Sequence, residues 1–232
     1  MERLDPHFVL NAYAVGVFPM ADARDASEVY WVEPRRRAVL PLDGFHLSRS
    51  LRKAVALDRF RVTADRAFDA VLALCGEAAD DRPDTWINPT IAEVFGRLHR
   101  LGHAHSIECW EGDRLAGGLY GLALGRAFFG ESMVSRATDS SKVALAWLVA
   151  RLRAGGFTLL DCQFQTAHLM SLGAVEVDRA DYLASLGTAL SGGAAGSAER
   201  GGDFFALDAA RSVSVAGPVA GKDIVQLLVH TS

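Results

Sequence analysis

The clearest helical pattern in the chain lies between residues 88 and 102. Apolar residues recur there at intervals of three and four, the spacing that places them on one face of a helix. Asn88 can cap this helix, Pro89 suits its first turn and Gly102 can end it. The residues expected to face the core are Ile91, Val94, Phe95, Leu98 and Leu101.

A second helix is predicted within the segment HLSRSLRKAVALD, residues 46–58, capped by Ser48 or Ser50. Three basic residues in it are three and four positions apart, so they share one face of the helix. These residues are Arg49, Arg52 and Lys53.

Beyond residue 104 the helical spacing gives way to short apolar runs separated by turns. Three such runs, residues 105–110, 114–124 and 127–135, predict the strands of an antiparallel meander. A helix is expected next, over residues 141–154. The nearly continuous apolar run 157–164 then predicts a central, buried strand.

Shorter helices are expected over residues 166–172 and 181–190, and weak strand signals occur near the end of the chain, at 203–207 and 224–229. Residues 191–202 have the composition of a linker or loop. The order of meander, helix, strand and helix is typical of an acetyltransferase-like (GNAT-type) α+β domain with a mixed, largely antiparallel sheet. We expect a small N-terminal domain over residues 1–40 and this larger domain over residues 41–232.

The composition indicates one sizeable core, because half of the 232 residues are hydrophobic. The charged first residues lack the apolar stretch of a signal peptide, and the longest apolar run, residues 115–125, is too short to span a bilayer. The three cysteines are far apart and form no CxxC pair, which disfavours a disulfide framework or a zinc site. We therefore expect a monomeric, soluble cytoplasmic protein without a metal or cofactor.

The basic residues are concentrated in one part of the chain. The net charge of the whole chain is −4, which disfavours a nucleic-acid partner if taken alone. Between residues 31 and 66, however, nine Lys or Arg stand against four Asp or Glu, so this stretch carries +5. Such asymmetry indicates either a polyanionic partner or a solvated charged face.

Two acids stand in apolar surroundings, where a carboxylate is costly to bury without a partner. Asp161 lies in the run LLDCQF, and Gln163, two residues further, shares its side of a strand. Glu131 lies near the end of the third meander strand. Each acid is either structural, with Glu131 paired to an arginine such as Arg136, or part of the floor of a site.

Other chemistry-bearing residues also have two interpretations. His168 is either a catalytic group or a packed or capping histidine, since no Ser or Cys partner stands at a recognisable spacing. Trp31 and Trp86 either stack on nucleic-acid bases or belong to the core. The residues that belong either to the core or to a pocket are Leu119, Phe128 and Met133.

Eight segments occur in a specific order along the chain. They are AYAVGVFPM, WVEPRRRAVLPL, HLSRSLRK, TWI, LGHAHSIECW, GGLYGLALGRAFFGESMVSR, SSKVAL, and DCQ followed by HL and SLGA. With these segments the sequence closely resembles the bacterial leucyl/phenylalanyl-tRNA–protein transferases from about residue 10 to residue 186. The combination of GESMVS, DCQ and SLGA is highly specific, whereas any one of them alone is not.

The resemblance implies an enzyme that moves leucine or phenylalanine, with methionine a further candidate, from aminoacyl-tRNA to the N-terminal amine of a protein. The acceptor is expected to begin with Arg or Lys, and the product is marked for degradation by the N-end rule. The implied catalytic residues are Asp161, Gln163 and Glu131. The implied aminoacyl side-chain pocket comprises Leu119, Phe128, Met133, Ser135, Leu152 and Leu160. The implied tRNA-binding residues are Trp86, Met20, Trp31, Arg49, Arg52 and Lys53.

Two features depart from a simple transfer of the family pattern. Met20 stands where some members have a tryptophan that stacks on the terminal adenine of the tRNA. Strict alternation along a strand places Leu160 and Asp161 on opposite faces. Both can line one site only if the strand bulges, ends there, or is reached from both sides.

The turn SRATDSSK, residues 135–142, bears on two alternative functions. In acetyltransferases the corresponding turn is rich in glycine, and its amides bind the pyrophosphate of CoA, whereas this turn contains no glycine. A CoA-dependent N-acetyltransferase therefore lacks its expected loop. A non-catalytic tRNA-binding module explains the basic stretch but leaves the group of Asp161, Gln163 and Glu131 unexplained.

Overall fold

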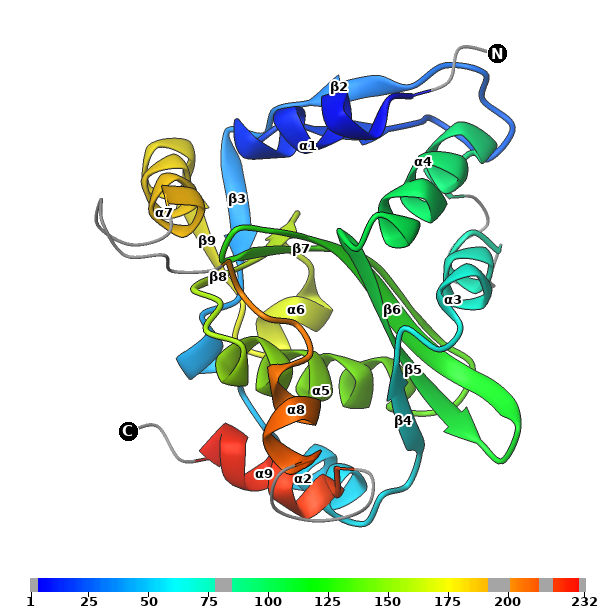
Figure 1. Cartoon of the computed structure of the whole chain (residues 1–232), viewed down its shortest axis with the longest axis vertical. Helices are drawn as coiled ribbons and strands as arrows, with labels where there is room; N and C mark the ends of the chain where they lie inside the picture. The colour runs from blue at the N-terminus through cyan, green and yellow to red at the C-terminus, as the bar shows by residue number, and fades with distance from the viewer. Residues whose placement is uncertain (1–3, 78–84, 192–200, 213–218, 230–232) are drawn as a thin grey trace.

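The computed structural model describes residues 4–77, 85–191, 201–212 and 219–229, and it has an α+β architecture (Figure 1). The strands are β1 (Phe18–Met20), β2 (Tyr30–Val32), β3 (Arg36–Val39), β4 (Arg61–Ala64), β5 (Ala104–Glu111), β6 (Arg114–Leu124), β7 (Ala127–Ser135), β8 (Leu159–Gln163) and β9 (Val175–Asp178). Seven of them form one mixed sheet in the order β4-β5-β6-β7-β8-β3-β9, while β1 and β2 form a separate antiparallel pair.

The helices pack on both faces of the large sheet. They are α1 (Pro6–Ala14), the 3₁₀ helix η1 (Leu42–Gly44), α2 (Arg49–Ala56), α3 (Phe68–Cys75), α4 (Pro89–Arg100), α5 (Ser140–Ala154), α6 (Ala167–Ser171), α7 (Arg179–Ser191), α8 (Ala206–Ser212) and α9 (Gly221–Val229). Ser48 caps α2 and Asn88 caps α4, each by accepting a backbone N–H of the first turn. These caps confirm the two helices predicted first from the sequence.

The meander predicted from the sequence is present as β5, β6 and β7. Antiparallel pairing joins β5 to β6 and β6 to β7. Helix α5 then crosses the sheet and returns the chain to β8, which pairs in parallel with β7 and antiparallel with β3. Strand β8 is therefore interior to the sheet and buried, as its continuous apolar run predicted.

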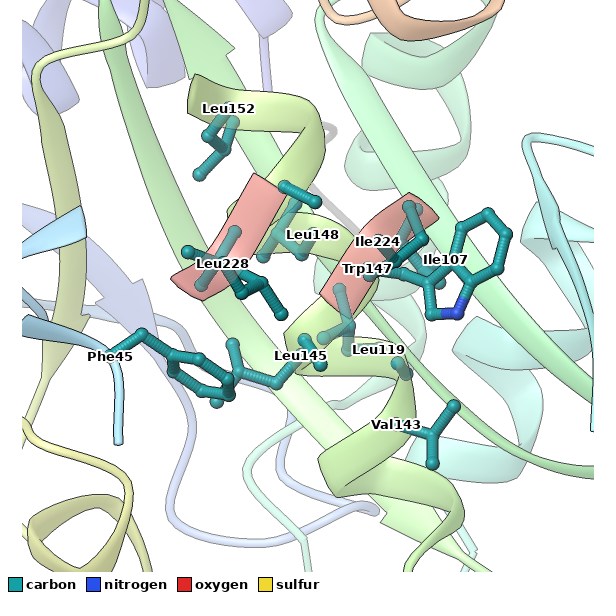
Figure 2. Packing of buried hydrophobic residues seen from close by; sticks show 14 of the residues in the cluster. Phe45, Ile107, Leu119, Val143, Leu145, Trp147, Leu148, Leu152, Ile224 and Leu228 are labelled. Atoms are coloured by element: carbon teal, nitrogen blue, oxygen red, sulfur yellow. The ribbon is translucent and has the colours of Figure 1, made fainter. Parts of the chain in front are cut away.

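Two hydrophobic clusters lie on opposite sides of the sheet. One fills the space between the sheet, α5 and the helices α2, α8 and α9. The other is built by α1, α3, α4 and α7. Figure 2 shows part of the first cluster, to which α5 contributes Leu145 and Leu148, β6 contributes Leu119, and α9 contributes Ile224 and Leu228.

The N-terminal segment contains a helix that the sequence interpretation missed. Asp5 accepts hydrogen bonds from the backbone N–H groups of His7 and Phe8, and Pro6 occupies the first turn of α1. After α1 and the β1–β2 pair, residues 36–39 enter the large sheet as β3, between β8 and β9. Residues 36–39 of the expected N-terminal domain thus belong to the large sheet, as its second strand from one edge.

The two strands predicted near the end of the chain are wrong. Residues 206–212 and 221–229 form helices α8 and α9. In α9, Ile224, Val225 and Leu228 face the core at helical spacing, but so short an apolar run has no period that separates a helix from a strand. Packing against α2 and α5 selects the helix. Of the expected linker 191–202, residues 192–200 lie outside the described residues.

Candidate active site

A cavity of about 270 Å³ opens where β7 and β8 separate. The two strands pair only from Ala127↔Leu159 to Phe129↔Asp161, and β7 continues for six residues beyond this pairing. The resulting gap is closed by α5 and α6. The residues that line the cavity are Trp86, Leu119, Tyr120, Gly130, Glu131, Ser132, Met133, Leu145, Leu148, Leu160, Cys162, Gln163, Phe164, Thr166, His168 and Leu169.

Glu131 enters this cavity from a β-bulge. In the pairing of β6 with β7, Gly121 lies opposite Gly130 and Tyr120 lies opposite Ser132, so Glu131 is the extra residue. Its side chain is 7% exposed. Glu131 Oε1 accepts hydrogen bonds from the Tyr13 hydroxyl at 2.8 Å and from Gln163 Nε2 at 3.0 Å.

Burial raises the pKa of Glu131 to about 8. The hydrogen bonds from Tyr13 and Gln163 lower this pKa, and the negative charge of Asp161 raises it, but loss of water is the largest cause. The alternative in which Glu131 pairs with Arg136 does not occur, because Arg136 instead binds Glu77 at 2.8 Å. Glu131 is therefore a neutral acid over most of the range below pH 8.

Asp161 is fully buried and held by a fully buried arginine. Arg37 Nη2 lies 2.6 Å from Asp161 Oδ2, and Arg37 Nε lies 2.9 Å from Oδ1. The Tyr182 hydroxyl donates a further hydrogen bond to Oδ2 at 2.8 Å. The guanidinium carbon of Arg37 lies 4.6 Å from the ring centroids of both Phe18 and Tyr182. These contacts occupy both carboxylate oxygens, and Asp161 does not line the cavity.

Gln163 ends β8 in a left-handed backbone conformation, with φ of 62°. Its backbone N–H donates to Asp161 Oδ1 at 2.7 Å, while its side chain donates to Glu131. This turn of the backbone resolves the conflict in the strand pattern. Leu160 and Cys162 line the cavity by alternation, Asp161 points away from it, and Gln163 returns to the cavity because the strand ends there.

Three residues of this network were missed by the sequence interpretation as site residues: Tyr13, Arg37 and Tyr182. Arg37 was counted only as part of the basic stretch. Its position in β3 carried a signal, because alternation places Arg37, the third arginine of RRR, on the face opposite Arg36, which is exposed. Tyr13 and Tyr182 come from α1 and α7, and their approach to β7 and β8 depends on tertiary packing.

The expected aminoacyl pocket is only partly brought together. Leu119, Met133 and Leu160 line the cavity, whereas Phe128, Leu152 and Ser135 do not. Phe128 and Leu152 are fully buried in the core, where Phe128 packs against the rings of Phe157 and Phe204. Ser135 is exposed, and its hydroxyl accepts the backbone N–H of Ser141 at 3.1 Å, which satisfies a donor in the first turn of α5.

The expected tRNA-binding residues lie in three places. Trp86 lines the cavity. Met20 and Trp31 belong to the β1–β2 pair, where Trp31 packs edge-to-face on Phe8. The three basic residues of α2 are exposed, and none forms an ion pair with another described residue. These residues are Arg49, Arg52 and Lys53.

Two further side chains of the cavity are uncharged. Burial and the nearby charge of Lys142 lower the pKa of His168, so its imidazole is neutral at pH 7. Its Nε2 has no hydrogen-bond partner in the described part of the chain. Burial also raises the pKa of the Cys162 thiol, which keeps it protonated and a poor nucleophile.

The described ranges contain neither a membrane-spanning helix nor a cluster of metal ligands. No helix there is long and apolar enough to cross a membrane. No group of three or more His, Cys, Asp or Glu side chains there is arranged to hold a metal ion.

Comparison with known proteins gives a consistent result. The sequence model for "Leucyl/phenylalanyl-tRNA protein transferase" matches residues 39–187, and the model for the N-terminal domain of the same proteins matches residues 2–35. The chain is similar to the leucyl/phenylalanyl-tRNA–protein transferase of Rhizorhabdus wittichii, with 59% identity across the whole of both chains. It is 63% identical to that of Zymomonas mobilis over 81% of this chain and 70% of the relative. With that of Afipia carboxidovorans the identity is 49%, over 99% and 95% of the two chains.

Proposed function

Because this chain belongs to the leucyl/phenylalanyl-tRNA protein transferase family, we propose that it transfers leucine or phenylalanine from aminoacyl-tRNA to the N-terminal amine of a protein. The chain is an aminoacyltransferase. The observation that carries the proposal is a cavity lined largely by apolar side chains, with the hydrogen-bonded pair Glu131 and Gln163 in its wall. The apolar side chains suit the transferred side chain, and the polar pair suits an ester and an amine.

The walls of the cavity favour a medium-sized apolar side chain. Leucines 119, 145, 148 and 160 and Met133 line a volume of about 270 Å³. Each methylene group that fills such a pocket contributes roughly 1–3 kcal/mol of discrimination against smaller residues. Among the described residues that line the cavity, Glu131 is the acid, and it is neutral at pH 7. The lining therefore offers no negative charge to a basic side chain on the transferred amino acid.

The reaction depends more on the alignment of the amine with the ester than on a strong base. The amine nitrogen forms a bond with the ester carbonyl carbon, and the bond from that carbon to the ribose 3′ oxygen breaks. The 3′ oxygen leaves with the proton that the amine loses. A protein N-terminal amine has a pKa of about 8, so about a tenth of it is neutral at pH 7. Correct positioning of this neutral fraction supplies much of the rate.

In this scheme Gln163 aligns the attacking amine through its amide oxygen. Its amide NH₂ is fixed by Glu131, which orients the oxygen. Asp161 acts indirectly. Its carboxylate accepts the backbone N–H of Gln163, and its side chain does not reach the cavity. Asp161 is therefore a positioning residue in this proposal, in contrast to Gln163.

We further propose that the larger domain has an acetyltransferase-like architecture, which is supported by the parallel β7–β8 pair that separates at the cavity. A CoA-dependent reaction is disfavoured by the turn before α5. There the Ser135 hydroxyl already accepts the N–H of Ser141, and the Ser140 hydroxyl lies 2.8 Å from the carbonyl oxygens of Ala116 and Ala137, to one of which it donates. These side chains occupy a turn that would otherwise present free amides to pyrophosphate.

The exposed basic face of α2 is proposed to contact phosphates of the tRNA. Replacing Arg49, Arg52 and Lys53 by alanine should weaken tRNA binding and reduce the slope of log K against log salt by about 2–3, because each lost phosphate contact removes about 0.7–0.9. Binding titrations over a range of salt concentrations measure this slope. The exposed Arg100 of α4 offers a control, since Arg100→Ala should leave the slope unchanged. An unchanged slope in the triple variant would contradict the assignment.

The first test of the function is transfer of labelled leucine from Leu-tRNA to a peptide that begins with Arg, with a peptide that begins with Gly as control. Labelling of the Arg peptide alone supports both the transfer and the expected Arg or Lys selectivity. Labelling of both peptides supports the transfer and contradicts the expected selectivity for Arg or Lys. No labelling while tRNA still binds would favour the non-catalytic tRNA-binding module. The monomeric state, the cytoplasmic location and the role in N-end rule degradation stay predictions.

A further inference from the structure

Glu131 is unusual among the polar groups of the cavity because its two oxygens have different surroundings. Oε1 accepts two hydrogen bonds, from Tyr13 and from Gln163. Oε2 is buried and has no hydrogen-bond partner among the described residues. The side chain is 7% exposed and borders the cavity in which the ester would lie.

The charges around Glu131 do not provide an ion pair for it. The titratable and charged groups around it are Tyr13 on α1, Arg37 on β3, Tyr120 on β6, Asp161 on β8, His168 on α6 and Tyr182 on α7. Arg37 is bound by Asp161 through two of its nitrogens, so the charges of these two groups largely compensate each other. An ionised Glu131 would then leave Oε2 as a bare, buried negative oxygen, which is costly.

We propose that Glu131 acts as a neutral carboxylic acid whose Oε2–H donates a hydrogen bond to the carbonyl oxygen of the aminoacyl ester as that oxygen becomes negative. The inference rests on the proposed function. When the amine attacks, the electron pair of the carbonyl double bond moves to this oxygen, and it returns when the bond to the ribose 3′ oxygen breaks. Glu131 keeps its proton throughout and stabilises the intermediate charge. This role differs from attraction of a basic acceptor residue, which requires an ionised carboxylate.

Glu131→Gln separates the two roles, because an amide has the same shape and keeps one acceptor and one donor. The expected result is transfer by Glu131→Gln at pH 7 within about tenfold of the unsubstituted enzyme, and a loss of about 100-fold or more in Glu131→Ala, the usual cost of removing such a donor. Equal loss in both variants would overturn the proposal, because it would show that the negative charge is needed.

The pH dependence gives a second readout. Glu131 loses its proton above a pKa of about 8, so the rate of the unsubstituted enzyme relative to Glu131→Gln should fall by up to about tenfold between pH 7 and 9. The titration of the acceptor amine cancels in this ratio. Glu108→Gln, which changes a buried carboxyl outside the cavity, should not alter the profile. A ratio that stays constant with pH would contradict a titrating Glu131.

A measurement without tRNA keeps the protonation state separate from the proposed function. The infrared difference spectrum between the unsubstituted protein and Glu131→Gln at pH 7 should contain the carbonyl-stretch band of a protonated carboxylic acid. Carboxylate bands in its place would overturn the inference even if transfer is active. If transfer fails in the unsubstituted protein, the proposed function fails, while the infrared band still reports on Glu131.

Discussion

Replacing Arg37 with alanine is expected to lower the free energy of unfolding by about 3–5 kcal/mol, the usual cost of removing one partner from a buried ion pair. Asp161 would remain in the interior without its cation, although it would keep the hydrogen bonds from Tyr182 and from the backbone of Gln163. Urea unfolding of the purified variant at pH 7 measures the loss.

The adjacent residue provides a matched control. Arg36 also contacts two acids, Glu176 at 2.6 Å and Asp178 at 3.1 Å, but its side chain is 55% exposed. An exposed pair of this kind contributes only about 0–1 kcal/mol. Arg36→Ala should therefore change the free energy of unfolding by about 1 kcal/mol or less. Equal and small effects of the two substitutions would show that burial of the Arg37–Asp161 pair does not set its energetic importance.

A milder substitution tests the same network without removing a charge. Tyr182→Phe deletes only the hydroxyl that donates to Asp161 Oδ2. This substitution should lower the free energy of unfolding by about 1 kcal/mol, the typical contribution of one hydrogen bond, or by somewhat more because the acceptor is charged. A loss as large as that of Arg37→Ala would instead assign the stability to the tyrosine.

The second large expected effect is on the rate of transfer. Gln163→Ala should lower kcat by about 100-fold, because the amine is no longer aligned and a displacement of about 1 Å at a reacting centre has this effect. The loss of stability should stay near 1 kcal/mol, since one hydrogen bond to Glu131 is removed and the backbone hydrogen bond to Asp161 is kept. Steady-state transfer at saturating Leu-tRNA and saturating acceptor peptide measures kcat.

Gln165 supplies the control for this substitution. It is a glutamine two residues further along, its amide donates to the Ala174 carbonyl, and it does not line the cavity. Gln165→Ala should leave the transfer rate nearly unchanged. If Gln163→Ala binds Leu-tRNA normally and transfers at the full rate, the role proposed for Gln163 is wrong.

The parts of the fold that were predictable are those with a strong local pattern. Helix α4 has both a cap and a clear apolar face, and the meander strands have alternating runs bounded by turns. Helix α1 has a start signal in Asp5–Pro6, but it is short and apolar around most of its surface. The apolar runs 203–207 and 224–229 are too short to separate a helix from a strand in the sequence. Packing against α5, and for α9 also against α2, decides that helices α8 and α9 form.

The site was predictable where residue type alone marked it. An acid or an amide within an apolar strand is conspicuous, and this singled out Asp161, Gln163 and Glu131. The separate roles of these three residues were not predictable. They depend on a bulge at Glu131 and a left-handed backbone at Gln163. These two departures from regular strand geometry bring both side chains to the cavity, whereas Asp161 points away from it.

The polar network also fixes when the site can exist during synthesis of the chain. Tyr13 contacts a residue 118 positions later, and Arg37 contacts one 124 positions later. Tyr182, the residue of this network that comes latest in the chain, belongs to α7 and lies near the end of the matched range 39–187. A nascent chain therefore holds Tyr13 without Glu131 until β7 has left the ribosome, and Arg37 without Asp161 until β8 has left it. Contacts this distant in sequence slow folding, so we expect the catalytic groups to come together late and all at once.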